Sequence, residues 1–159
     1  MPDTEPASDL EQRLRNAIAL VSATPGYESV GAELGRLLST GKLQFVPALV
    51  DRGEATLGGR LLVGPEALYS SPVGLAETLV HEYWHLRRQP PLEKTTSFWI
   101  GVATGKPVMR RYEMPAYRFA LRFLTAVGQT FPTLAEEARS EQEMIRASFA
   151  DSYGGPLTE

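Results

Sequence analysis

Apolar residues recur three and four positions apart in several stretches of the chain, which is the spacing of one helical face. The first stretch predicts a helix over residues 9 to 23, opened by a capping box of Ser8 and Glu11. A second predicted helix ends at Gly41. The apolar positions of the two helices are Leu10, Leu14, Ile18, Val21, Val30, Leu34, Leu37 and Leu38. We expect these helices to be scaffold, with a prosegment or a partner-docking surface as the alternative.

The pattern changes between residues 43 and 63, where short apolar runs at 43–50 and 60–63 are separated by polar residues and glycines. Such runs predict a small β-sheet. Pro47 lacks the N–H that a central strand must donate, so we expect the first run at an edge or a bulge. An exposed edge beside a functional helix can hold an extended peptide through main-chain hydrogen bonds. A ribbon that only closes the core is an equal alternative.

A third helix is predicted from Ser71-Pro72 to about Arg88, because serine is a common N-cap and proline fits the first helical position. Its apolar residues occupy more than one face, so we expect it to be buried on more than one side. These residues are Leu75, Leu79, Val80, Tyr83, Trp84 and Leu86. A helix buried in this way would hold its side chains rigidly.

Two more helices are predicted in the second half of the chain. One follows Glu113, and the other covers about residues 134 to 150, capped by Thr133 with Glu136. The whole pattern therefore predicts an α+β fold that is mainly helical, with a small β-sheet packed beside the third helix and a following helix that carries a glutamate. We expect one domain over residues 9–150, after a disordered leader at 1–8 and before a flexible tail at 151–159.

Composition narrows the possible partners and ligands. The net charge of −3 and the lack of a long basic block argue against nucleic acid, and the apolar runs are too short for a membrane span. The chain has no cysteine, which excludes disulfides, thiolate metal ligands and a cysteine nucleophile. The polar first eight residues lack a signal-peptide pattern, so we expect a cytoplasmic protein. The sequence leaves the oligomeric state open.

The segment His81-Glu82-Tyr83-Trp84-His85 lies on the third predicted helix and contains both histidines of the chain. Residues four apart share a helical face, so both rings can grip one Zn²⁺ from adjacent turns. Glu82, next to the first ring, could then reach a metal-bound water. The pattern therefore indicates a metallohydrolase. Two core histidines on an amphipathic helix are the alternative.

A catalytic zinc usually has three protein ligands, so a further donor is required. With no third histidine and no cysteine, this donor must be a carboxylate. The sequence favours Glu113, because it opens an apolar helical stripe and a buried carboxylate needs a charge partner or a metal. A salt bridge of Glu113 with Arg110 or Arg111 is the alternative. The other acidic candidates are Glu93, Glu136, Glu137, Glu141 and Glu143.

His81-Glu82-x-x-His85 followed by Glu113-x-x-Ala116-x-x-Phe119-Ala120 resembles the gluzincin class of zinc peptidases, and within it the compact ImmA/IrrE-like and minigluzincin proteins. The likeness covers roughly residues 43 to 126. It implies a minimal zincin-like fold in which His81, His85 and Glu113 are metal ligands and Glu82 is the catalytic base. Pro115 departs from the family pattern, so the sequence predicts Glu113 just before its helix or at a kink. The bulky Trp84 before His85 is a second departure.

The implied reaction is hydrolysis of a peptide or protein substrate, in which Glu82 takes the proton of the attacking water. Tyr117, one turn beyond Glu113, could donate its hydroxyl to the oxyanion, and a tyrosine that only packs is the alternative. Two other functions stay open. One is a regulatory protein of the same fold that acts on a specific partner, such as a transcriptional repressor, as the resemblance implies. The other is a zinc-stabilised domain without turnover.

Overall fold

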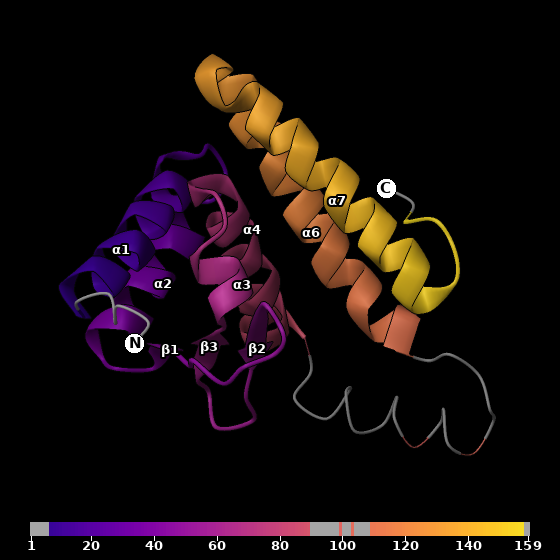
Figure 1. Ribbon diagram of the computed structural model, residues 1–159, viewed down its shortest axis with the longest axis horizontal. Helices are drawn as coiled ribbons and strands as arrows, with labels where there is room; N and C mark the ends of the chain where they lie inside the picture. Colours follow the sequence, from indigo (N-terminus) through magenta and orange to yellow (C-terminus); the bar gives the residue numbers. More distant parts are fainter. Residues whose placement is uncertain (1–6, 90–98, 100–102, 104–108, 158–159) are drawn as a thin grey trace, which may run out of the picture.

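The protein is mainly helical with one small sheet, as the computed structural model describes it for residues 7–89, 99, 103 and 109–157 (Figure 1). This confirms the predicted α+β class. The helices are α1 (Ala7–Ala23), α2 (Glu28–Ser39), α3 (Pro65–Leu68), α4 (Pro72–Tyr83), the π-helical turn η1 (Trp84–Arg88), α6 (Met109–Thr130), the 3₁₀ turn η2 (Pro132–Leu134) and α7 (Ala135–Tyr153). The strands are β1 (Leu43–Phe45), β2 (Gly53–Ala55) and β3 (Leu61–Val63).

The first two helices lie where the apolar spacing predicted them, and their predicted inward faces are largely buried. Gly41 follows α2 with a φ of 72°, a left-handed conformation that glycine adopts without steric cost, which explains the end of this helix. The capping box is wrong, because α1 starts at Ala7 and so includes Ser8. Residues 7 and 8 of the predicted leader therefore belong to α1, and residues 1–6 lie outside the described part of the chain.

The sheet has the order β1-β3-β2, with β1 parallel and β2 antiparallel to β3. β1 lies at an edge, as the proline at position 47 predicted, and Pro47 itself falls just after the strand. The sequence did not predict strand β2, because its Gly-Glu-Ala sequence has little β-propensity. These residues lie in the polar and glycine-containing stretch between the two predicted apolar runs. This missed strand forms the other edge, and it packs against α4, as β3 does.

Helix α4 is at the centre of the molecule, with α1 and α2 on one side and the pair α6 and α7 on the other (Figure 1). The Ser71 hydroxyl accepts a hydrogen bond of 3.0 Å from the backbone N–H of Gly74, which confirms the predicted N-cap. Every residue from Val73 to Glu82 is buried, as expected for a helix that is apolar on more than one face. No helix in the described ranges is long and apolar enough to cross a membrane.

The boundaries of the last two helices differ from the predicted ones. α6 begins at Met109, four residues before Glu113. The N-cap of α7 is Leu134 and makes no side-chain hydrogen bond, so the predicted capping box at Thr133 is wrong. α7 continues to Tyr153, three residues into the predicted flexible tail, and Leu157 is buried in the core. Packing of an apolar residue near the end of the described chain therefore orders part of this tail.

Candidate functional site

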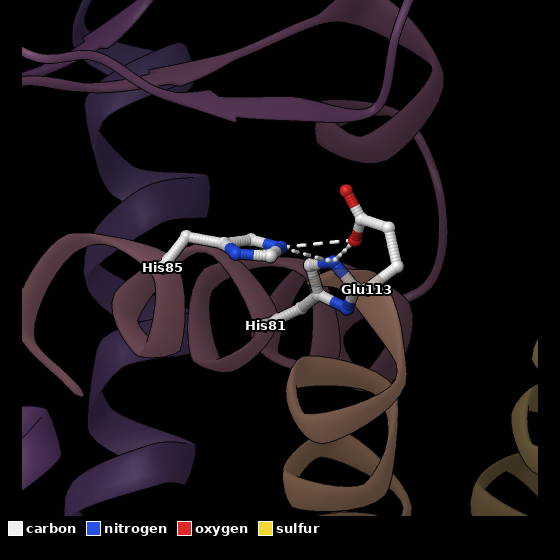
Figure 2. Close-up of side chains that lie close together, drawn as sticks. All are labelled: His81, His85 and Glu113. Carbon is white, nitrogen blue, oxygen red and sulfur yellow. Dashed lines mark hydrogen bonds and ion pairs between the residues drawn. The ribbon is translucent and has the colours of Figure 1, made fainter. Parts of the chain in front are cut away.

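Three side chains from two helices meet at one point between α4 and α6 (Figure 2). The Nε2 atoms of His81 and His85 lie 3.1 Å and 2.9 Å from Oε2 of Glu113, and 3.2 Å from each other. The three atoms can serve as ligands of one metal ion, since all lie within 4.8 Å of one another. The structure therefore brings together the two histidines and the carboxylate that the sequence favoured.

The two histidines come from one helical segment, and Glu113 comes from another. His81 and His85 are four residues apart, so their rings project from the same face of the continuous helical segment formed by α4 and η1. Glu113 lies in the second turn of α6, so the prediction that Pro115 would place it before the helix is wrong, whereas a kink at Pro115 stays a prediction. Pro115 removes one helical hydrogen bond, the one to the carbonyl of residue 111, and α6 continues through it.

The salt-bridge alternative for Glu113 lies outside the described side chains, because those of Arg110 and Arg111 are not among them. Within the part of the chain that the structure describes, the ionic partners of Glu113 are His81 and His85. Its side chain is 16% exposed, and those of the two histidines are 11% and 5% exposed. The group is therefore largely shielded from water, which strengthens the interactions among its charges.

The local charges shift the pKa values of the group in opposite directions. Burial by itself lowers the pKa of His81, but the hydrogen bond to Glu113 and the nearby carboxylates outweigh burial and raise it to about 9. Burial by itself raises the pKa of Glu113, but the adjacent His81 and His85 outweigh burial and lower it to about 2. The metal-free group therefore contains a protonated His81 and an ionised Glu113 at neutral pH.

Glu82 is buried between α4 and strand β2. The backbone N–H of Ala55 bonds to its carboxylate, and a Cβ atom on Gly53 would lie only 2.7 Å from its Cγ. Burial raises the pKa of Glu82, and the nearby histidines partly oppose this rise. Strand β2 therefore confines the side chain of Glu82 beside His81, and a glycine at position 53 leaves the space that it occupies.

Tyr117 lies one turn beyond Glu113 and lines the same cavity. Its ring packs edge-on against His81, with 4.5 Å between the ring centres, and also contacts Phe149 of α7. Burial raises the pKa of the Tyr117 hydroxyl, so this group keeps its proton at neutral pH and can act as a donor. The tyrosine packs between His81 and Phe149 and borders the cavity, and its role as an oxyanion donor stays a prediction.

The histidines and Glu113 face a cavity of about 550 Å³. Strand β2 and the loop before it form one wall, and α7 forms another. Residues of these two walls are Val50, Asp51, Arg52, Gly53, Glu54, Ala55, Met144, Ile145, Ser148, Ser152 and Tyr153. Such a cavity between an edge strand and a helix can admit an extended chain.

Sequence reasoning missed several residues around the group. Glu77 is buried one turn before His81, and burial raises its pKa. Gln89 contacts His85, and its spacing of four residues from that histidine was an available signal. Gly53 was another, because glycine in a strand often marks a close backbone approach. Tyr153 gave no signal, since only the packing of α7 brings it to the cavity.

Comparisons with known proteins add no relative to this picture. No family model matches the chain, and searches of curated proteins and of solved structures found no match. The chemical interpretation therefore depends on the group itself, which combines two imidazole nitrogens and one carboxylate oxygen that could hold a metal ion.

Proposed function

We propose that the protein is a zinc-dependent metallopeptidase with a minimal zincin-like fold. The observation that carries this proposal is the convergence of the Nε2 atoms of His81 and His85 with a carboxylate oxygen of Glu113, beside a buried Glu82 and an open cavity. Two histidines and one carboxylate are a donor set typical of catalytic zinc. Zinc at such a site supplies Lewis acidity, which polarises a carbonyl group and lowers the pKa of a water molecule.

Glu82 is the proposed general base. Its carboxylate would take a proton from the water that attacks the substrate carbonyl and would then pass this proton to the departing amine nitrogen. The N–H of Ala55 supports this role, because it orients the carboxylate before any substrate enters. Burial supports it as well, since a raised pKa makes Glu82 a stronger base than an exposed carboxylate.

Strand β2 is the proposed substrate edge, in place of the β1 edge that the sequence suggested. The carbonyl of Arg52 and the N–H of Thr56 bond to the hairpin partner strand and its flanks. Because main-chain groups alternate along an antiparallel strand, those of Gly53 and Ala55 face away from β3. The main-chain N–H and carbonyl of Gly53 and the carbonyl of Ala55 could pair with an extended peptide.

Tyr117 could then donate its hydroxyl to the developing oxyanion.

Two substitutions test the proposal. Glu82→Gln should retain zinc and lower peptide hydrolysis by about 10²- to 10⁴-fold, because the amide cannot accept the proton. Glu113→Ala should lose zinc, because it removes a ligand. Zinc content is measured by elemental analysis after purification with added zinc, and hydrolysis by mass spectrometry of a digested peptide mixture. Glu143→Gln, an exposed carboxylate on α7, is the matched control for both measurements.

The possible results separate the candidate functions. A wild-type chain that neither contains zinc nor takes it up would contradict the metal site and with it the peptidase. A chain that binds zinc through Glu113 without cleaving any peptide in the mixture would leave two alternatives. A zinc-stabilised domain would be insensitive to Glu82→Gln in every biological assay, whereas a regulatory protease that acts on one partner would lose its effect.

A further inference from the structure

Gln89 is a buried amide placed between the two elements that carry the metal-binding group. Its residue is 8% exposed, and it follows directly after the π-helical turn η1. Its Oε1 contacts Nδ1 of His85, and its Nε2 donates a hydrogen bond of 2.9 Å to the backbone carbonyl of Tyr112. A buried amide is stabilised only when its polar atoms are paired, and here both ends are paired.

The directions of these two hydrogen bonds follow from chemistry. A backbone carbonyl can only accept, so the amide nitrogen of Gln89 must face Tyr112 and the amide oxygen must face His85. This oxygen can also only accept, so Nδ1 of His85 must carry the proton. Nε2 is then the nitrogen of His85 that faces His81 and Glu113, as a metal ligand must.

The amide nitrogen of Gln89 bonds to the segment that carries Glu113, the third proposed ligand. Tyr112 directly precedes Glu113, and its ring also stacks on His85 with 4.6 Å between ring centres and 13° between ring planes. The π-helical turn contributes to this arrangement. Its backbone bond from the N–H of Gln89 to the carbonyl of Trp84 spans five residues and precedes the contact of the Gln89 amide with Nδ1 of His85.

We propose that Gln89 is a positioning residue for the metal site, which holds the proton of His85 on Nδ1 and ties this histidine to the backbone beside Glu113. The inference deepens the proposed function and depends on it. Residues that hold the far nitrogen of a ligating histidine typically change metal affinity by about 10- to 100-fold when they are replaced. Gln89 would act through His85 and Glu113 and would not touch the substrate.

The test compares Gln89→Met with Gln142→Met, using Zn²⁺ alone as the probe in a chelator competition assay. Methionine keeps the length of glutamine and removes both hydrogen bonds. Gln142 is the matched control, because its amide bonds to Thr125 on the far part of the α6–α7 pair. We expect the zinc dissociation constant of Gln89→Met to rise by about 10- to 100-fold over the wild type, with Gln142→Met unchanged. Gln89→Glu should recover part of the affinity, since a carboxylate still accepts from Nδ1–H.

A spectroscopic readout separates positioning from a general loss of stability. In the zinc-loaded wild type, the Nδ1–H proton of His85 should exchange slowly in nuclear magnetic resonance spectra, and this protection should vanish in Gln89→Met. Fast exchange in the wild type would overturn the proposal even if no variant folds. Equal zinc affinity of Gln89→Met and Gln142→Met would overturn it as well. In both cases the wild type still binds zinc, whereas a wild type without zinc would contradict the proposed function first.

Discussion

His81 illustrates how single residues in the group depend on their neighbours. Its pKa of about 9 in the metal-free protein exceeds the ordinary value of 6.5, because Glu113 and other carboxylates stabilise the charged ring against the effect of burial. A metal ligand must be unprotonated, so zinc has to displace this proton. The carboxylate of Glu113 has no proton to displace, since its pKa is lowered to about 2.

We therefore expect zinc binding at pH 7 to release about one proton from His81, and fewer as the pH rises above 9. Isothermal titration calorimetry in buffers of different ionisation enthalpy measures this number. A number of released protons that does not depend on pH between 7 and 10 would contradict the assignment of the proton to His81.

The same shift predicts how the stability of the metal-free protein depends on pH. Below pH 6.5 the folded and the unfolded chain both hold the proton, so the stabilisation from His81 is fully present. Between pH 6.5 and 9 the unfolded chain releases it first, and this stabilisation is lost as the pH rises through the folded value. Thermal melts with a chelator should show a Tm that falls over this range. In His81→Gln this part of the fall should be absent.

At the scale of elements, the β2–β3 hairpin packs closely against α4 at Gly53, where a side chain has no space. A Cβ atom at Gly53 would lie 2.7 Å from Cγ of Glu82 and 3.0 Å from Cγ2 of Thr78. These distances are shorter than ordinary carbon contacts, so any side chain at this position forces the strand or Glu82 to move. The spacing of the strand from the helix thus determines where the proposed base lies.

Gly53→Ala should therefore lower hydrolysis by about 10²-fold, the effect typical of a displacement of about 1 Å in a catalytic group. It should leave zinc content unchanged, because no metal ligand lies on β2. The measurements are kcat/KM on a cleaved peptide and elemental analysis. Gly58→Ala in the same hairpin is the control, since its Cβ would lie 3.8 Å from the nearest atom, Oγ1 of Thr56. Equal activity of both variants would show that the contact with Glu82 has no role.

At the scale of the whole molecule, the proposed metal-binding group links two layers that are far apart in the sequence. His81 and His85 belong to the central helix and its π-helical end, whereas Glu113 belongs to the α6–α7 pair (Figure 1). A metal bound by all three residues would bind only the folded arrangement. Binding of this kind stabilises the folded state by mass action.

We expect zinc at 100 times its dissociation constant to stabilise the protein by about 2.7 kcal/mol. For a domain of this size each kcal/mol raises Tm by about 2–4 °C, so the shift is easily measured by differential scanning fluorimetry. Glu113→Ala should abolish the shift, and Glu143→Gln should keep it. A shift that persists in Glu113→Ala would mean that zinc stabilises the protein at another place.

Short-range patterns determined much of this protein. The helices α1, α2 and α4, the α+β class and the edge position of β1 follow from apolar spacing, Ser71, Gly41 and Pro47, because these signals act within a few residues. The pairing of His81 with His85 follows from helical geometry alone. A carboxylate as the third candidate ligand follows by elimination, since the chain has no cysteine and no third histidine, and the apolar stripe after Glu113 favours this residue.

Only the tertiary structure decided the second edge strand and the meeting of the three side chains, because both depend on contacts between residues that are distant in the sequence. Strand β2 has weak propensity and exists through its pairing with β3 and its packing on α4. The continuation of α6 through Pro115 places Glu113 on a helix, and the hydrogen bond from Gln89 to the Tyr112 carbonyl links the residue after η1 to this helix. The sequence by itself thus supplied the candidate ligands, whereas packing between α4, α6 and the sheet set the positions in which they meet.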